Sequence, residues 1–482
     1  MKRPKIYAHG SYIGNTGFNQ HTRDFFRALN KFADIKVRNF TIGNTWEKYS
    51  LEPHNKEPYF NDIDRKILYE QILWENDGRR KNYSIYPDKS KDFTPDVNIV
   101  LCETNHYLYY DSYDGPMIAY NVWESTLQPE QYFNRLLEYD ELWVPSKWQR
   151  DVTIKQGYDP NKIKVVPEGV DIDVFYPNAQ AKHELTSDGR FKFFLAGRWD
   201  YRKSTKEIIE TFIKTFDPSE PVDLIVSIDN AWGDRIDGFH STEERLKHYN
   251  INHEGIEVIH FPTREEYVNY LKNGDVFVSC ARSEGWNFPL IAAMACGTPS
   301  LYSNWGGQLQ FTKDKGIPVS IKGLTPANHE HKDFPGDYCE PDWVDLSVKM
   351  LNAVVDYKKY KSFALVEAEE IHRDFNWEYV AEIADNRLKK IFPSFAFVTT
   401  GNIGYMPVIE KMVQSLLEFS NQKIIVYGVE CDVPFDYPNV IKRRIDPIKI
   451  SEHDKWYWKQ WACLESLNEG YDYYIWIDGD VV

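Results

Sequence analysis

The most specific stretch of the sequence reads Ser283-Glu-Gly-Trp-Asn-Phe-Pro-Leu-Ile-Ala-Ala-Met-Ala-Cys-Gly-Thr-Pro299. A loop carboxylate, Glu284, and a Gly-Trp-Asn turn lead into a helix of small residues that Gly297 caps and Pro299 ends. The unpaired N–H groups at the start of such a helix can bind phosphate, and the neighbouring carboxylate can accept hydrogen bonds from sugar hydroxyls. A purely structural strand-loop-helix unit does not need this combination, so the stretch predicts a ligand site in an α/β domain.

The segments around this stretch predict two α/β domains of similar size. Short apolar runs alternate with helical or turn segments in both halves, which is typical of parallel, doubly wound sheets. We expect strands at residues 5–8, 97–102, 117–120 and 141–144, and then at 191–196, 223–228, 256–259, 276–279 and 299–302. The polar segment from Pro167 to Gly189 lies between the two series and is predicted to connect the domains.

A third α/β pattern begins after Pro393-Ser394. We expect strands at 395–399, 423–427 and 473–477, and a helix at 408–419. The last strand leads into Asp478-Gly-Asp480. Carboxylates at i and i+2 point the same way, so both can reach one Mn²⁺ or Mg²⁺ that bridges a diphosphate, although a bare Asp-x-Asp is a weak signal. We interpret this segment as a partial third domain in a truncated chain.

Composition excludes several classes of protein. The 482 residues carry 73 acidic and 57 basic side chains, and the net charge of −16 disfavours binding to nucleic acid. No apolar run reaches the roughly 18 residues of a membrane-spanning helix, and Met1-Lys-Arg-Pro4 leads directly into a strand-like segment. We expect a cytoplasmic protein, for which peripheral membrane contact stays open. The six cysteines form no C-x-x-C pair and are expected to be buried free thiols.

Two further loops follow predicted strands. Gly10-Ser-Tyr-Ile-Gly14-Asn-Thr-Gly17 opens a helix and fits contact with a diphosphate or an acceptor, although a tight β-to-α turn is an equal explanation. Gly197-Arg198-Trp-Asp-Tyr-Arg-Lys203 places Arg198 and Lys203 where they can neutralise a diphosphate leaving group, and a solvated basic loop is the alternative. Gly306 and Gly307, after the next strand, add backbone amides to the same edge.

Residues 1–392 resemble the large family of retaining glycosyltransferases that includes glycogen-synthase-like and lipopolysaccharide-type enzymes. The segments that carry the resemblance are those above together with Trp143-Val-Pro-Ser146, Val165-Val-Pro-Glu-Gly-Val-Asp171, Gly336-Asp-Tyr-Cys-Glu-Pro-Asp342 and Phe375-Asn-Trp-Glu378. The resemblance implies the GT-B architecture of two Rossmann-like domains. We expect an acceptor domain at 1–180, a donor domain at 181–375, a crossover helix at 376–393, and a truncated segment at 394–482 that resembles the first half of a GT-A glycosyltransferase.

The resemblance also assigns roles to residues. Arg198 and Lys203 would bind the donor diphosphate, Glu284 the transferred sugar, and Gly285, Trp286, Asn287 and Phe288 the sugar and phosphates. The family usually carries a second glutamate eight positions after the first, which contacts the ribose, and here that position is Ala292. Another carboxylate such as Glu340 could replace it, or donor binding could be weakened or lost.

Acceptor-side electrostatics are assigned to Glu124, which stands where many relatives have a His-Asp pair. Trp123 is either a sugar platform or core. His9 and His106 are weaker candidates that we expect to be ordinary core or loop histidines.

Taken together, these residues predict an EC 2.4 hexosyltransferase that moves a sugar, with retention, from a UDP- or GDP-sugar to a glycan, lipid-linked or protein-linked hydroxyl. No metal is expected to be required at the GT-B site, whereas Mn²⁺ or Mg²⁺ would bind at Asp478 and Asp480. By analogy, two joined transferase domains suggest successive steps on one glycan. A GT-B-fold epimerase or phosphorylase and a catalytically impaired carbohydrate-binding scaffold remain as alternatives.

Overall fold

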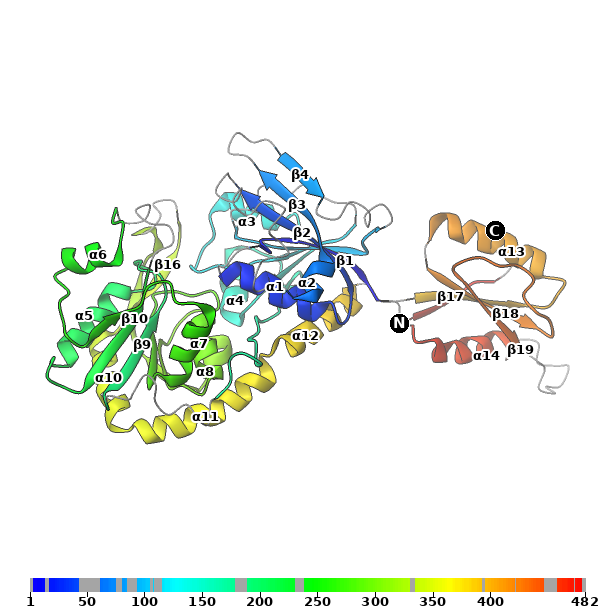
Figure 1. The fold of residues 1–482 in the computed structure, drawn as a ribbon. Helices are drawn as coiled ribbons and strands as arrows, with labels where there is room; N and C mark the ends of the chain where they lie inside the picture. The colour runs from blue at the N-terminus through cyan, green and yellow to red at the C-terminus, as the bar shows by residue number, and fades with distance from the viewer. Residues whose placement is uncertain are drawn as a thin grey trace. The chain divides into compact units, whose positions relative to one another are not determined.

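The computed structural model (Figure 1) contains two compact units, Pro4–Ile383 and Ala384–Val482 together with the first three residues. Each unit is described by itself. The described residues are 3–13, 17–42, 61–74, 80–84, 93–104, 107, 115–177, 189–229, 238–329, 334–391, 395–420, 422–445, 457–471 and 473–478.

The first half of the larger unit is built on an eight-stranded sheet of order β4-β3-β2-β1-β5-β6-β7-β8. All neighbours are parallel except β3 and β4. The strands are β1 (Lys5–Gly10), β2 (Asp34–Ile42), β3 (Leu68–Trp74), β4 (Arg80–Ser84), β5 (Val97–Leu101), β6 (Met117–Tyr120), β7 (Glu141–Val144) and β8 (Ile163–Val165). The helices are α1 (Gly17–Leu29), α2 (Asp62–Ile67), α3 (Glu130–Leu136) and α4 (Lys147–Gln156). β5 to β7 are almost wholly buried, because helices cover both faces of such a sheet.

The second half is built on a six-stranded parallel sheet of order β11-β10-β9-β12-β13-β14. The strands are β9 (Phe191–Ala196), β10 (Val222–Ser227), β11 (Ile256–Val258), β12 (Val276–Ser279), β13 (Ser300–Ser303) and β14 (Ile317–Val319). The helices are α5 (Thr205–Thr215), α6 (Thr242–His248), α7 (Arg264–Asn273), α8 (Phe288–Ala295), α9 (Leu309–Thr312), α10 (Trp343–Val355) and α11 (Tyr357–Asp374). An antiparallel pair, β15 (Ile321–Pro326) and β16 (Asp337–Pro341), forms a separate two-stranded sheet.

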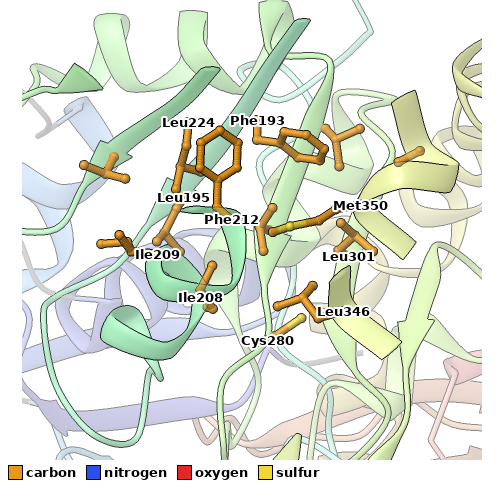
Figure 2. Close-up of a cluster of buried hydrophobic side chains, with 14 of the residues drawn as sticks. Phe193, Leu195, Ile208, Ile209, Phe212, Leu224, Cys280, Leu301, Leu346 and Met350 are labelled. Atoms are coloured by element: carbon orange, nitrogen blue, oxygen red, sulfur yellow. The ribbon is translucent and has the colours of Figure 1, made fainter. Parts of the chain in front are cut away.

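One core of this second half lies between the sheet and the helices α5 and α10 (Figure 2), and a second one packs around α8. Phe193 and Leu224 from the sheet meet Phe212 of α5 and Leu346 and Met350 of α10, and all five are fully buried. This core fixes the start of α5, and therefore the loop that joins β9 to α5.

The chain passes between the two halves twice, at adjacent positions. Val170 pairs with Asn376 in an isolated parallel bridge, and the Val170 amide donates to the Phe375 carbonyl over 2.8 Å. The helix α12 (Trp377–Ile391) starts here, and the boundary between the compact units falls inside it.

The smaller unit has a four-stranded parallel sheet of order β19-β18-β17-β20. Its elements are β17 (Phe395–Gly401), α13 (Met406–Phe419), β18 (Lys423–Val429), β19 (Val440–Ile445), α14 (Tyr457–Ser466) and β20 (Tyr473–Trp476). In the described part of the whole chain, no helix combines the length and the apolar character needed to cross a bilayer.

The predicted α/β class, with two halves built on largely parallel sheets, is confirmed. All six cysteines are free thiols, as expected. Only four of them are buried, because Cys431 and Cys463 lie in the smaller unit at half-buried positions. The assignment of the smaller unit to GT-A remains a prediction.

Candidate functional site

The predicted site residues meet where the carboxyl ends of the two large sheets face each other, a region that we call the junction. Arg202, which follows β9, forms an ion pair with Glu124, which follows β6, with 3.1 Å between Nε and Oε2. The Ser283 hydroxyl, after β12, donates to the Glu124 carbonyl. Trp148 in α4 packs edge-on against Trp305, after β13, with ring centroids 4.9 Å apart. Both halves of the larger unit therefore contribute to one site.

Glu284 is at the centre of the junction and is held by two cations of its own domain. Its side chain is only 4% exposed, and its oxygens lie 2.5 Å from Lys203 Nζ and 3.1 Å from Arg202 Nη1. Burial alone would raise the pKa of Glu284, but the ammonium of Lys203 and the guanidinium of Arg202 lower it below its ordinary value. Glu284 is therefore an anion at neutral pH, able to accept hydrogen bonds from sugar hydroxyls.

The loop that carries Arg198 and Lys203 is shaped by Asp200. This buried carboxylate accepts from Arg198 Nε and from the Lys203 amide at 2.6 Å. Burial acts to raise its pKa, but Arg202 and Arg198 lower it overall. The interpretation as a solvated basic loop is wrong, because all three cations fold against carboxylates. Arg198 remains the most exposed of them, at 33%, against 18% for Lys203.

The turn after Glu284 brings the two domains into close contact. A Cβ atom on Gly285 would lie 2.5 Å from Val122 Cγ1 and 2.9 Å from the Trp123 carbonyl, so glycine is required there. Trp286 is 2% exposed and packs on Phe311 and Phe375. Any contact of Trp286 with a donor would therefore come from its backbone.

Asn287 caps α8 rather than presenting its side chain to a ligand. Its φ is +86°, its Oδ1 accepts from the Leu290 amide, and its Nδ2 donates to Gln308 Oε1 over 2.6 Å and to Ser279 Oγ over 3.0 Å. The side chain is buried, so we assign it to holding the loop in place. Phe288, the next residue, is partly buried at the start of α8.

Gly306 and Gly307 pack against the backbone of the Glu284 turn. Gly306 has φ of +88°, and a Cβ atom on Gly307 would lie 1.8 Å from the Gly285 carbonyl oxygen. The Gly307 amide donates to the Glu284 carbonyl over 2.9 Å. The expectation that this amide binds a ligand is therefore corrected: it is used to fix Glu284.

The glycine-rich first loop is only partly described. Gly14 lies outside the described residues, whereas Gly17 is exposed at the start of α1. A Cβ atom there would approach Phe288 Cδ2 no closer than 4.0 Å. The start of α1 thus lies beside the start of α8, and packing alone does not require glycine at position 17.

The two positions considered for ribose recognition are Ala292, where the family has a glutamate, and Glu340, the possible substitute. Ala292 is buried in the apolar cluster around α8. Glu340 accepts from Arg282 Nε at 2.9 Å and from Trp343 Nε1 at 2.8 Å, so its carboxylate is tied to its own domain.

Among the acceptor-side candidates that the structure describes, only Glu124 presents an accessible side chain, 40% exposed. The open question about Trp123 is resolved in favour of core, because its Nε1 donates to Ser125 Oγ and to the Leu127 carbonyl and its ring packs on Phe334. His9 is fully buried, with Nε2 3.2 Å from Asn98 Oδ1, as expected of a core histidine. His106 lies outside the described residues.

Sequence reasoning missed three participants. The first is Arg202, which was included in the basic loop without being assigned a role. Glu103 follows β5, and burial raises its pKa while Arg198 opposes the shift and Glu124 adds to it. The third, Glu168, lies in the connecting segment already singled out as Pro167-Glu-Gly169.

Glu168 forms a buried pair with His21 of α1, with 3.2 Å between Oε2 and Nδ1. Burial lowers the pKa of His21 to about 3. Burial also raises the pKa of Glu168 well above its ordinary value, and the charges of Glu124 and Glu284 add to this effect. The pattern of single residues gives no signal for such a pair, because it forms only when α1 meets the connecting segment.

In the smaller unit, Asp478 accepts hydrogen bonds from Lys459 and from Trp476 Nε1, and the bond from Lys459 is the main cause of a lowered pKa. Asp480 lies outside the described residues. Among the residues that are described, no group of three His, Cys, Asp or Glu side chains is arranged to hold a metal ion.

Comparisons with known proteins bear on the larger unit. Residues 178–328 match the family model described as "Glycosyl transferases group 1". A curated relative, D-inositol 3-phosphate glycosyltransferase of Paenarthrobacter aurescens, is 25% identical over 234 residues, which cover 47% of this chain and 51% of the relative. The chain therefore spans about half the length of that relative.

Solved structures extend the likeness to both halves of the larger unit. Anabaena Alr3699/HepE in complex with UDP-glucose has a TM-score of 0.58 at 14% identity, over 80% of this chain and 100% of that one. Sucrose-phosphate synthase from Thermosynechococcus elongatus has a TM-score of 0.56 at 16% identity, over 81% and 99%. At these identities the likeness shows the fold alone, which is the two-domain GT-B fold.

Proposed function

We propose that the larger unit is a glycosyltransferase of class EC 2.4 that moves a sugar from a nucleotide-sugar donor to an acceptor hydroxyl. The observation that carries the proposal is the buried Glu284, held between Lys203 and Arg202 at the carboxyl ends of β9 and β12. Lys203 and Glu284 are 81 residues apart in sequence. The segment that contains all three residues matches the group 1 family model.

The donor diphosphate is held by Arg198 and Lys203, with the N-terminus of α8 nearby. Two cations offset the charge that develops on a leaving diphosphate, so this site requires no metal ion. Anabaena HepE was solved in complex with UDP-glucose, which supports a UDP-sugar here, with a GDP-sugar as the second choice.

During transfer, the bond from the sugar carbon to the diphosphate breaks, the acceptor oxygen bonds to the same carbon, and the proton of the acceptor hydroxyl passes to the departing diphosphate. The resemblance to retaining enzymes supports attack from the face that the diphosphate leaves. Glu284 orients the sugar, Glu124 provides acceptor-side electrostatics, and contact between the domains excludes water. The acceptor is a glycan or a lipid-linked or protein-linked hydroxyl, and we place the reaction in the cytoplasm.

For the smaller unit, we propose a GT-A-like domain that binds Mn²⁺ or Mg²⁺ through Asp478 and Asp480. Carboxylate oxygens suit both ions.

The donor is identified by calorimetric titration of UDP, GDP and ADP, and of their common sugar conjugates, into the full chain in excess EDTA. Chelation silences Asp478 and Asp480 and leaves the metal-independent site to report. Binding of one nucleotide class supports the proposal. No binding of any of them contradicts it and favours a carbohydrate-binding scaffold that has lost its donor.

A further inference from the structure

We propose that Arg202 is a positioning residue that links the acceptor-side carboxylate Glu124 to the donor-side carboxylate Glu284, and that it does not bind the diphosphate. This inference rests on the proposed glycosyl transfer and assigns separate tasks to the three cations of the loop after β9.

The guanidinium of Arg202 makes three contacts. Nε lies 3.1 Å from Glu124 Oε2, Nη1 lies 3.1 Å from Glu284 Oε2, and Nη1 also donates to the Ser283 carbonyl over 2.8 Å. The side chain is only 6% exposed. The contacts with Glu124 and Glu284 are ion pairs, and the Ser283 carbonyl accepts the hydrogen bond, so one delocalised guanidinium charge serves two carboxylates.

Arg202 is therefore poorly placed for a phosphate ligand, whereas its neighbours are better placed. Arg198 is one-third exposed. Lys203 has a flexible stem and a point charge that can turn from Glu284 to a phosphate oxygen.

The junction needs a fixed cation because carboxylates of both domains gather there. The charges of Glu124, from one domain, and of Glu284, from the other, both raise the pKa of the buried Glu168. Lys203 forms an ion pair with Glu284 within its own domain, and Arg202 also lowers the pKa of Asp200 in that domain. Whereas Lys203 pairs with a carboxylate of its own domain, Arg202 also contacts Glu124 of the other domain. The ion pair between Arg202 and Glu124 therefore forms only when the two domains are together. Through this pair, Arg202 sets the spacing between the carboxylates of Glu124 and Glu284 around the reacting carbon.

The test uses UDP-glucose as the probe and measures UDP release by Arg202→Gln, Arg202→Lys, Glu124→Gln and the double variant of Arg202→Gln with Glu124→Gln. Arg264→Gln is the control, since Arg264 pairs with Asp171 outside the junction. We expect Arg202→Gln to lower kcat about tenfold or more while KM changes less than about threefold, because a misplaced group costs rate rather than ground-state binding. Arg202→Lys should restore part of kcat, and the double variant should be no slower than the slower single variant.

A rise in KM of about tenfold with kcat preserved, as expected for a lost phosphate ligand, would overturn the inference. So would additive effects on kcat. If the wild-type chain releases no UDP, the proposed function is in question, and the same cycle is then measured on melting temperature in the unliganded chain. Non-additive losses of melting temperature would support the link between Arg202 and Glu124, and additive losses would contradict it.

Discussion

Lys203 Nζ lies 2.5 Å from Glu284 Oε1, so a cation assigned to the donor diphosphate also has a carboxylate partner in its own domain. The pair keeps Glu284 ionised and keeps Lys203 at the edge of the site. A donor diphosphate would therefore compete with Glu284 for this ammonium, and Glu284 would become available to the hydroxyls of the sugar that enters with it.

The first prediction concerns the stability of this pair. Lys203→Met should lower the free energy of unfolding of the larger unit by ~1–3 kcal/mol, because Glu284 is then buried with Arg202 as its remaining ion-pair partner. Urea denaturation measures the loss. Lys214→Met is the control, because Lys214 is exposed and lies 3.8 Å from Glu210. Equal losses in the two variants would show that the buried pair does not stabilise the fold.

The second prediction concerns the contact between the domains at Gly285. Gly285→Ala should lower the rate of sugar transfer by about 10- to 100-fold, because its methyl group would collide with Val122 and the Trp123 carbonyl and separate the two walls of the site. Gly404→Ala is the control, since Gly404 lies in the smaller unit and a Cβ atom there would come no closer than 3.4 Å to Asn402 Oδ1. Similar rates for both variants would contradict the close approach.

The third prediction concerns pH and His21. Burial lowers the pKa of His21 to about 3 from its ordinary 6.5. Because the folded-state pKa is the lower one, His21 contributes stability above pH 6.5 that is lost as the pH falls toward 3, at up to about 1.4 kcal/mol per pH unit. Denaturation at about pH 7 and about pH 5.5 should show a smaller loss for His21→Gln than for the wild type. Glu168 acts with the opposite sign, because its raised pKa adds stability as the pH falls. A Glu168→Gln variant, which keeps the imidazole, should therefore lose more stability than the wild type over this interval; equal losses in His21→Gln and the wild type would argue against a buried neutral His21.

The fourth prediction concerns a metal ion at the smaller unit. Mn²⁺ binding, followed by electron paramagnetic resonance, should be abolished by Asp478→Asn. It should be strengthened about two- to fivefold by Lys459→Gln, because the exposed Lys459 competes with the ion for Asp478. Binding that is unchanged in Asp478→Asn would remove Asp478 from the proposed metal site.

The fold and the location of the site could be predicted from sequence because both depend on local patterns. Apolar runs mark the strands, and the carboxyl ends of parallel strands meet at one edge, so the loops that carry Lys203 and Glu284 had to lie together. The identity of the Glu284 turn was visible from its glycines and its helix cap.

The partners within the site could not be predicted, since they depend on how two domains meet. Nothing near Arg202 in sequence indicates Glu124 as its partner, and nothing near His21 indicates Glu168. The sequence also did not predict which groups point toward a ligand. The Trp286 side chain packs in the core, and the backbone amide of Gly307 donates to the Glu284 carbonyl.

The most direct test of the central claim is the affinity of UDP for the full chain in excess EDTA, measured by calorimetry for the wild type, Arg198→Ala and Arg264→Gln. We predict that Arg198→Ala weakens binding by about 10- to 100-fold, because a charge-assisted contact to the diphosphate is lost, and that Arg264→Gln binds as the wild type does. Undiminished affinity in Arg198→Ala would contradict a diphosphate site at the loop after β9.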